Sequence, residues 1–167
     1  MPIVGNGDIA SVLTDREDRL YFVSGVSNSQ ETRRSEYERE KKLLLSQDRY
    51  RHIVYVSTLA VFYTDTLYAQ HKLRMERLIK QNFKHYTILR IGNITFGNNP
   101  HTIINFLKNK IKNGEDFEVR NVYRYLITKE ELLYWIDMIP EWPCEMNCPG
   151  ERVLVPEIVE RIKRGEL

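Results

Sequence analysis

The stretch HIVYVSTLAVFYTDTLYAQHK, residues 52–72, decides the expected fold. Its first five residues are mostly apolar, β-branched or aromatic, which predicts a buried strand. Ser57 and Thr58 follow at the carboxyl end of that strand, where open α/β sheets bind their ligands. Tyr68 and Lys72 then open a run of good helix formers, and their spacing predicts that both side chains share one helix face.

This arrangement suits acid–base chemistry. A free Tyr phenol has a pKa of about 10, and a nearby ammonium such as that of Lys72 favours the ionised phenolate. A hydroxyl from Thr58 or Ser57 could hold a carbonyl or carbinol oxygen against the phenol of Tyr68. The alternative is a helix on which Tyr68 only packs and Lys72 is solvated.

Length and composition indicate an ordinary globular domain. The chain has 167 residues, of which 42% are hydrophobic and 29% charged, enough for one sizeable core. A net charge of +2 argues against nucleic acid or a membrane surface as a partner. No apolar run approaches the ~18 residues of a membrane span, and the N-terminal residues lack the pattern of a signal peptide. We therefore expect a cytoplasmic protein.

Cys144 and Cys148 are the two cysteines of the sequence. Their spacing is not that of a redox Cys-x-x-C motif, and no nearby His or further Cys could complete a zinc site. We expect two reduced thiols and no metal.

Residues 5–10 read Gly-Asn-Gly-Asp-Ile-Ala after a short apolar strand. In a dinucleotide-binding unit, Gly5 permits a tight turn, Gly7 lets a pyrophosphate approach the backbone, and Ala10 allows close packing of a helix expected over 9–13. The alternative is an ordinary Gly-Asn-Gly turn. The candidate phosphate-binding residues are Gly5, Asn6, Gly7, Ile9 and Ala10.

The order of strand, Ser-Thr pair, aromatic-rich loop and Tyr-x-x-x-Lys helix resembles that of the short-chain dehydrogenase/reductases. It is most similar to their extended branch of nucleotide-sugar epimerases, dehydratases and reductases. Tyr-x-x-x-Lys also occurs at 37–41 and 125–129, but only the copy at 68–72 follows a strand ending in hydroxyls. The resemblance implies that Thr58, with Ser57 beside it, orients substrate. Tyr68 would be the acid/base, and Lys72 would lower its pKa and hold the nicotinamide ribose.

The segment LYFVSGVSNS, residues 20–29, resembles the strand that lies beside the nicotinamide in this family, so Ser24 and Gly25 are expected to contact NAD or NADP. Full-length members carry two further strands and a helix between the glycine turn and this strand, whereas here the gap is 11–19. The missing part includes the acidic residue that binds the adenosine ribose. The adenosine half of a dinucleotide therefore has no evident pocket wall. Three alternatives follow: the cofactor binds weakly, the fold binds a smaller nucleotide, or cofactor binding has been lost.

Two more segments resemble the family's substrate-binding regions. Residues 86–91 predict a strand, and LRIGNITFG around it matches Asn93 to an Asn that contacts the sugar-nucleotide phosphate. Arg124, in NVYRYLITKEELLYWIDMI, matches an Arg that clamps a nucleotide diphosphate. The alternatives are a turn-forming Asn and a surface Arg.

The remaining segments are predominantly helical. Residues 29–47 predict a charged, largely solvated helix capped by Ser29. In the family this helix and the Tyr-Lys helix pair with a second copy, which implies a homodimer. Further helices are expected over 101–112, over 129–139 with Thr128 as cap, and from 155 onward, with a Pro-rich loop over 140–150.

These segments predict one α/β domain, residues 1–167: a three-layer Rossmann-like sandwich with a reduced parallel sheet and a small C-terminal cap. Residues 1–100 would form the nucleotide-binding part and 101–167 the cap, with strands near Ile3, Phe22, Val54 and Leu89. Three functions remain open: a minimal NAD(P)-dependent oxidoreductase, epimerase or dehydratase acting on a nucleotide sugar, a silent module that binds a nucleotide or sugar nucleotide, and a dimeric interaction protein.

Overall fold

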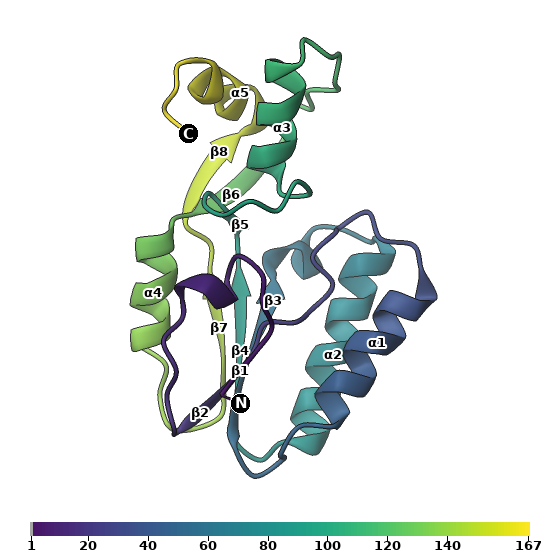
Figure 1. Cartoon of the computed structure of the whole chain (residues 1–167), viewed down its shortest axis with the longest axis vertical. Helices are drawn as coiled ribbons and strands as arrows, with labels where there is room; N and C mark the ends of the chain where they lie inside the picture. The colour runs from purple at the N-terminus through teal and green to yellow at the C-terminus, as the bar shows by residue number, and fades with distance from the viewer. Residues whose placement is uncertain (1) are drawn as a thin grey trace.

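The computed structural model describes residues 2–167, which form a three-layer α/β unit with a smaller unit above it (Figure 1). The main sheet is wholly parallel, in the order β1-β2-β3-β4-β7. Helices α1 and α2 cover one face, and α4 and the short turn η1 lie on the other (Figure 1). The predicted Rossmann-like sandwich with a reduced parallel sheet is therefore confirmed. The elements are β1 (Ile3–Val4), η1 (Ala10–Val12), β2 (Arg19–Phe22), α1 (Arg34–Leu45), β3 (His52–Thr58), η2 (Leu59–Phe62), α2 (Leu67–Asn82), β4 (Tyr86–Ile91), α4 (Lys129–Asp137) and β7 (Cys144–Cys148).

Alternation along the strands builds two cores, because successive side chains of a strand point to opposite faces. Phe22 and Tyr55 belong to the first core, packed under α1 and α2. Tyr21 and Val54, their neighbours in sequence, belong to the second core, packed under α4 with Leu132. Every residue of β2 is buried, as expected for a strand covered on both faces.

The smaller unit has its own core and sheet, in the order β5-β6-β8. Its strands are packed against two amphipathic helices, and the helix expected over 101–112 is confirmed as α3. Between β6 and β8 in sequence, the chain returns to the main unit and forms α4 and β7. The smaller unit is therefore not one continuous segment over 101–167. The elements of this unit are β5 (Asn93–Ile94), α3 (Ile103–Lys112), β6 (Tyr123–Ile127), β8 (Glu151–Leu154) and α5 (Val155–Lys163).

The loop expected over 140–150 is wrong in its middle, where Cys144–Cys148 form the fifth strand, β7. Two of its residues, Glu145 and Asn147, are polar, so the sequence lacks the apolar run that predicts a buried strand. Arg90 on β4 donates to both side chains, at 2.5 and 3.2 Å. The partner that stabilises this edge strand therefore lies about 55 residues away in the sequence, beyond the reach of a local pattern.

Two helix predictions also need correction. The helix expected from Ser29 begins at Arg34, and no side chain caps it, so Ser29 is not its cap. This helix is not simply a solvated outer layer, since Glu40 and Leu44 are fully buried. The helix expected over 9–13 is the three-residue 3₁₀ turn η1. The cap of α4 is as predicted: the Thr128 side chain and Glu131 form a reciprocal capping box.

Cys144 and Cys148 are both free thiols. Four residues apart on one extended strand, their Cα atoms are separated by roughly 13 Å, too far for a disulfide. Within residues 2–167, no helix combines the length and apolar character needed to cross a membrane.

Candidate functional site

Tyr68 and Lys72 lie one turn apart near the start of α2. The helix starts there because the Thr66 side chain accepts a hydrogen bond from the backbone N–H of Ala69, at 3.1 Å. The Lys72 ammonium lies 5.6 Å from the centre of the Tyr68 ring. The predicted proximity of the phenol and the amine is therefore present in the structure.

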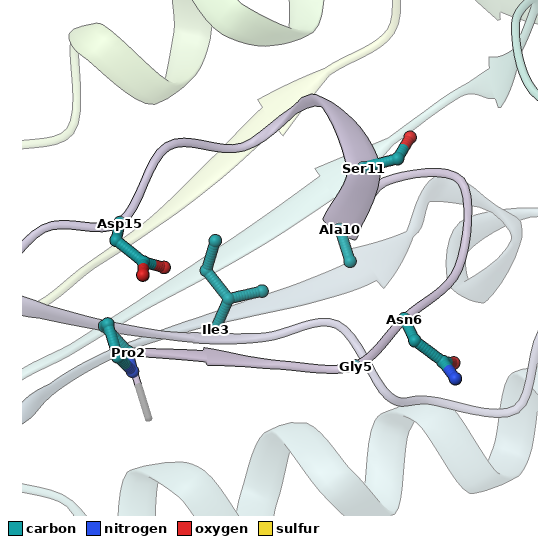
Figure 2. Close-up of a pocket in the computed structure, with 7 residues that line it drawn as sticks. All are labelled: Pro2, Ile3, Gly5, Asn6, Ala10, Ser11 and Asp15. Carbon is teal, nitrogen blue, oxygen red and sulfur yellow. The ribbon is translucent and has the colours of Figure 1, made fainter.

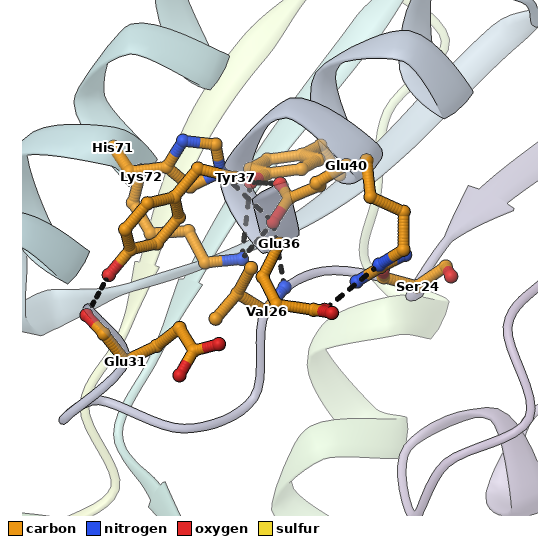
Figure 3. A network of polar contacts seen from close by, with 10 residues as sticks. Ser24, Val26, Glu31, Glu36, Tyr37, Glu40, His71 and Lys72 are labelled. Carbon is orange, nitrogen blue, oxygen red and sulfur yellow. Dashed lines mark hydrogen bonds and ion pairs between the residues drawn. The ribbon is translucent and has the colours of Figure 1, made fainter. Parts of the chain in front are cut away.

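The Lys72 ammonium is directed into the protein. Lys72 is 3% exposed, and its Nζ lies 3.2 Å from the Tyr55 hydroxyl and 3.4 Å from Oε1 of Glu40. Figure 3 shows Lys72 from α2 and Glu40 from α1 meeting between the helices and the sheet. The Lys72 ammonium therefore lies close to both the Tyr68 ring and the buried carboxylate of Glu40.

Glu40 is the centre of this buried group. It accepts hydrogen bonds from the Val26 backbone N–H, at 2.7 Å, and from the Tyr55 hydroxyl, at 2.5 Å. The Nε2 of His71 lies 3.2 Å from Oε1 of Glu40 without forming a hydrogen bond. Burial alone would raise the pKa of Glu40, but Lys72 and the hydrogen-bond donors outweigh burial and lower it well below its ordinary value. Glu40 is therefore an anion at neutral pH.

Gly25 leaves the space that Lys72 occupies. A Cβ at Gly25 would collide with Nζ of Lys72 and would lie 3.2 Å from Oε1 of Glu40. A side chain at Gly25 would therefore displace the Lys72 ammonium from its present position. The structure thus brings together Gly25 and Lys72, two of the predicted cofactor-binding residues. The carbonyl oxygen of the neighbouring Ser24 accepts a hydrogen bond from the Arg39 guanidinium, at 3.1 Å.

Burial raises the pKa of Tyr68, while Lys72 lowers it and Glu40 raises it further. The net direction is upward, opposite to that expected from the Tyr-Lys pair alone. The reason is that Glu40 offsets part of the charge of Lys72 and the half-buried phenol is poorly solvated. At neutral pH, Tyr68 is a neutral phenol able to donate a proton.

Ser57 and Thr58 differ in their surroundings because consecutive residues of β3 point to opposite faces. Ser57 is 3% exposed and donates to Oε2 of Glu76 on α2, at 3.3 Å. Thr58 is half-buried, and its Oγ1 accepts from the backbone N–H of Ala60, at 3.1 Å. Accepting this bond leaves the Thr58 hydroxyl proton available to a ligand. Of the two hydroxyls, Thr58 is the better placed to meet a substrate.

The glycine turn borders a hollow of about 300 Å³ beside β1 (Figure 2). Gly5 has a φ of +138°, and a Cβ there would lie 2.7 Å from the carbonyl oxygen of Val23, so the turn requires glycine. Of the other predicted residues, Asn6 and Ala10 line the hollow, whereas Ile9 packs against the second core. Gly7 is exposed, with open space where a side chain would be.

Asp8, within the glycine turn, is hydrogen-bonded to the loop that follows β5. Its two carboxylate oxygens accept hydrogen bonds from the backbone N–H groups of Asn98 and Asn99, at 2.9 and 2.8 Å. Gly97 makes this contact possible, because a Cβ there would collide with the Asp8 carboxylate. These two hydrogen bonds connect the glycine turn to the loop that follows β5.

Asn93 and Arg124 lie on the adjacent strands β5 and β6. The Asn93 amide donates to the carbonyl oxygen of Tyr125, at 3.0 Å. The Arg124 guanidinium donates to the carbonyl oxygen of Tyr123 and lies 5.7 Å from the centre of the Tyr63 ring. The sequence did not indicate Tyr63, which is 44% exposed and presents an aromatic face beside a cation.

Comparison with known proteins identifies the fold. Neither the known protein-family models nor the curated protein sequences include a match to this chain. Among solved structures, the fold matches WbmG of Bordetella bronchiseptica, determined with NAD and UDP, at a TM-score of 0.57 and 15% identity over 69% of this chain and 43% of WbmG. It matches the capsular polysaccharide assembling protein CapF of Staphylococcus aureus at 0.58 and 18%, over 89% of this chain and 45% of CapF. The Thermus thermophilus UDP-glucose 4-epimerase, determined with NAD, matches at 0.56 and 15%, over 69% of this chain and 48% of the epimerase.

The chain spans less than half the length of each of these three proteins. At such identities the likeness establishes the fold alone. The glycine turn, Gly25 and the Tyr68–Lys72 pair are the residues that could hold the pyrophosphate and nicotinamide-ribose side of a dinucleotide. The adenosine side has no corresponding wall within residues 2–167, because β1 is an edge strand of the sheet.

Proposed function

We propose that this chain is a minimal NAD(P)-dependent enzyme of the epimerase, dehydratase or reductase type that acts on a nucleotide sugar. The observation that carries the proposal is the Tyr68–Lys72 pair on α2, beside Gly25 at the carboxyl end of β2. Solved structures with this fold include complexes with NAD, with NADP and with UDP, which supports the ligand class. A cytoplasmic location stays a prediction from the sequence.

The chain's own residues have distinct roles in this proposal. The bound dinucleotide would supply or accept the hydride. The Tyr68 phenol donates or accepts a proton at the substrate oxygen, and the Thr58 hydroxyl orients that oxygen. Lys72 stabilises the phenolate when it forms, with Glu40 fixing the ammonium. Arg124 and Asn93 hold the diphosphate of the substrate, since a guanidinium suits paired phosphate oxygens.

Replacing Tyr68 by Phe tests the catalytic role. We expect turnover to fall by at least about 100-fold, because the proton donor is lost, while ligand affinity changes little. The assays pair UDP- or dTDP-sugars with NAD⁺ or NADP⁺, which accept the hydride, and the corresponding keto-sugars with NADH or NADPH, which supply it. Steady-state kinetics and calorimetric titration measure the two quantities. Tyr134→Phe, at an exposed site on α4, is the matched control and should leave both unchanged. An active protein that keeps its rate after Tyr68→Phe contradicts the role.

A second candidate is a catalytically silent module that binds a nucleotide or sugar nucleotide. The observation that favours it is the Glu40–Lys72 contact, which offsets the charge that should activate Tyr68, together with the raised pKa of the phenol. Calorimetric titration with NADH, NADPH, UDP and UDP-sugars separates the candidates. Dinucleotide binding supports the enzyme, and binding of UDP or UDP-sugars alone supports the silent module. Binding of none of them supports an interaction protein.

A further inference from the structure

A groove of about 590 Å³ runs between α1 and α2 on their outer side, away from the glycine turn. It follows α2 from Leu67 to Gln81, and fourteen residues of helix are about 21 Å long. From α1 the groove is lined by Arg34, Tyr37 and Lys41, which recur every three or four residues and so form one helix face. An elongated groove between two helices has the shape that receives a third helix.

The groove has an apolar floor. Met75 is 1% exposed, and Tyr37 and Leu78 are half-buried beside it. Leu67, at one end of the groove, is 51% exposed and adds apolar surface there. Tyr37 is held in place by its hydroxyl, which donates to the carbonyl oxygen of Glu31, and by its ring, which is 4.5 Å from that of His71 (Figure 3). The floor is therefore already shaped in the free chain.

The rim of the groove is strongly basic. Arg34, Lys41, Arg74 and Arg77 are all exposed, and Glu38 is the one acidic residue among those that line it. Within residues 2–167, none of these four cations forms an ion pair with a carboxylate, in contrast to Arg39 on the same helix, which pairs with Glu36. The lining thus carries four positive charges and one negative charge, with His71 taken as neutral.

This charge decides the kind of partner. A second copy across a two-fold axis at the groove would set eight cations against two Glu38 carboxylates, and like charges across an interface cost affinity. A nucleic acid would use the basic rim but leave the apolar floor uncovered. We propose that this groove binds an acidic amphipathic helix of a partner protein, with apolar residues on the floor and carboxylates on the rim. The homodimer through these helices that the family resemblance implies is disfavoured by the same charges.

The test uses a fluorescein-labelled peptide of about 14 residues with leucines on one helical face and glutamates elsewhere. We expect saturable binding in fluorescence anisotropy that weakens as salt is raised. The double variant Arg74→Glu with Arg77→Glu should raise Kd at least about tenfold, and Arg34→Glu with Lys41→Glu on the facing helix should do the same. Lys42→Glu, exposed on α1 outside the groove, is the control and should leave Kd unchanged.

Several results would overturn the proposal. These are absence of binding, equal binding of a peptide with lysines in place of the glutamates, and equal binding of the same residues in scrambled order. Tighter binding of a single-stranded oligonucleotide would assign the basic rim to nucleic acid. A dimer in sedimentation equilibrium, with α1 and α2 protected from hydrogen exchange, would assign the groove to a second copy. Thermal melts of each variant confirm that the fold is intact.

Discussion

The two cores on either side of the main sheet differ in chemistry. The core under α4 is built from apolar residues such as Tyr21, Val54 and Leu132. At its edge the buried Arg19 guanidinium donates to backbone carbonyl oxygens at the end of α4 and just beyond it, and among residues 2–167 no carboxylate is buried there. Under α1 and α2 the apolar residues are joined by buried charges, chiefly Glu40 and Lys72. A buried ion pair adds little net stability over an apolar pair of the same size, because both charges lose their hydration. This ion pair lies beside Tyr68, so these buried charges border the candidate site.

Glu40→Gln should give the largest effect, because it leaves the Lys72 ammonium buried without its counter-charge. We expect a loss of about 3–5 kcal/mol in the free energy of unfolding, measured by urea denaturation at pH 7. Lys72→Met added to Glu40→Gln should recover part of the loss, since the stranded charge is then removed. Glu36→Gln, in an exposed ion pair on the same helix, should change the free energy by less than ~1 kcal/mol. An equally small loss for Glu40→Gln would show that the pair is not energetically coupled.

The same pair predicts a pH dependence. The pKa of Glu40 is lowered in the folded protein, so its contribution to stability is complete above the ordinary pKa of 4.5 and is lost as pH falls below that value. Wild-type protein should therefore lose more stability than Glu40→Gln between neutral pH and acid pH. Parallel curves for the two proteins would contradict the assigned pKa direction.

Leu132→Ala probes the apolar core and should cost about 2–5 kcal/mol by leaving a cavity at a fully buried position. Because the buried carboxylates Glu40 and Glu76 lie on the other face of the sheet, the loss should be the same above and below pH 4.5. Urea denaturation at the two pH values measures it. A loss that depends on pH would mean that the two cores are not chemically distinct.

Asp8→Asn should have the smallest effect, about 1–2 kcal/mol, because the amide keeps one acceptor for the two backbone donors that the carboxylate now serves. Hydrogen exchange should show faster exchange at the amides of Asn98 and Asn99, with Lys110→Gln on α3 as the control. Unchanged protection would show that this contact does not fix the glycine turn.

The sequence predicted the fold well where local patterns were strong. Residues 86–91, the helix with Tyr68 and Lys72, and the Thr128 cap are as expected. It failed at β7, whose polar side chains accept hydrogen bonds from Arg90. Arg90 lies on the neighbouring strand β4, which is about 55 residues earlier in the sequence. The sequence also failed for the glycine turn, since spacing of glycines does not determine the length of the helix that follows.

The candidate site was predicted only in part. The spacing of four residues placed Tyr68 beside Lys72, but nothing in that spacing revealed the buried Glu40, which lies 32 residues from Lys72 in the sequence. Lys72 lowers the pKa of Tyr68 as expected, but burial, the larger influence, and Glu40 both raise it, so the net direction is upward. A charged residue within a charged helix gives no local sign that it will be buried, so only packing could show it.

The most direct test of the account is a titration of the isotope-labelled protein with NADH and NADPH, followed by backbone amide NMR. The account predicts saturable shifts concentrated at Gly5, Gly7, Ser24 and Gly25, where the glycine turn and the end of β2 meet the Tyr68–Lys72 pair. Shifts elsewhere, or none at millimolar dinucleotide, would contradict the proposal that this sheet holds a nicotinamide cofactor.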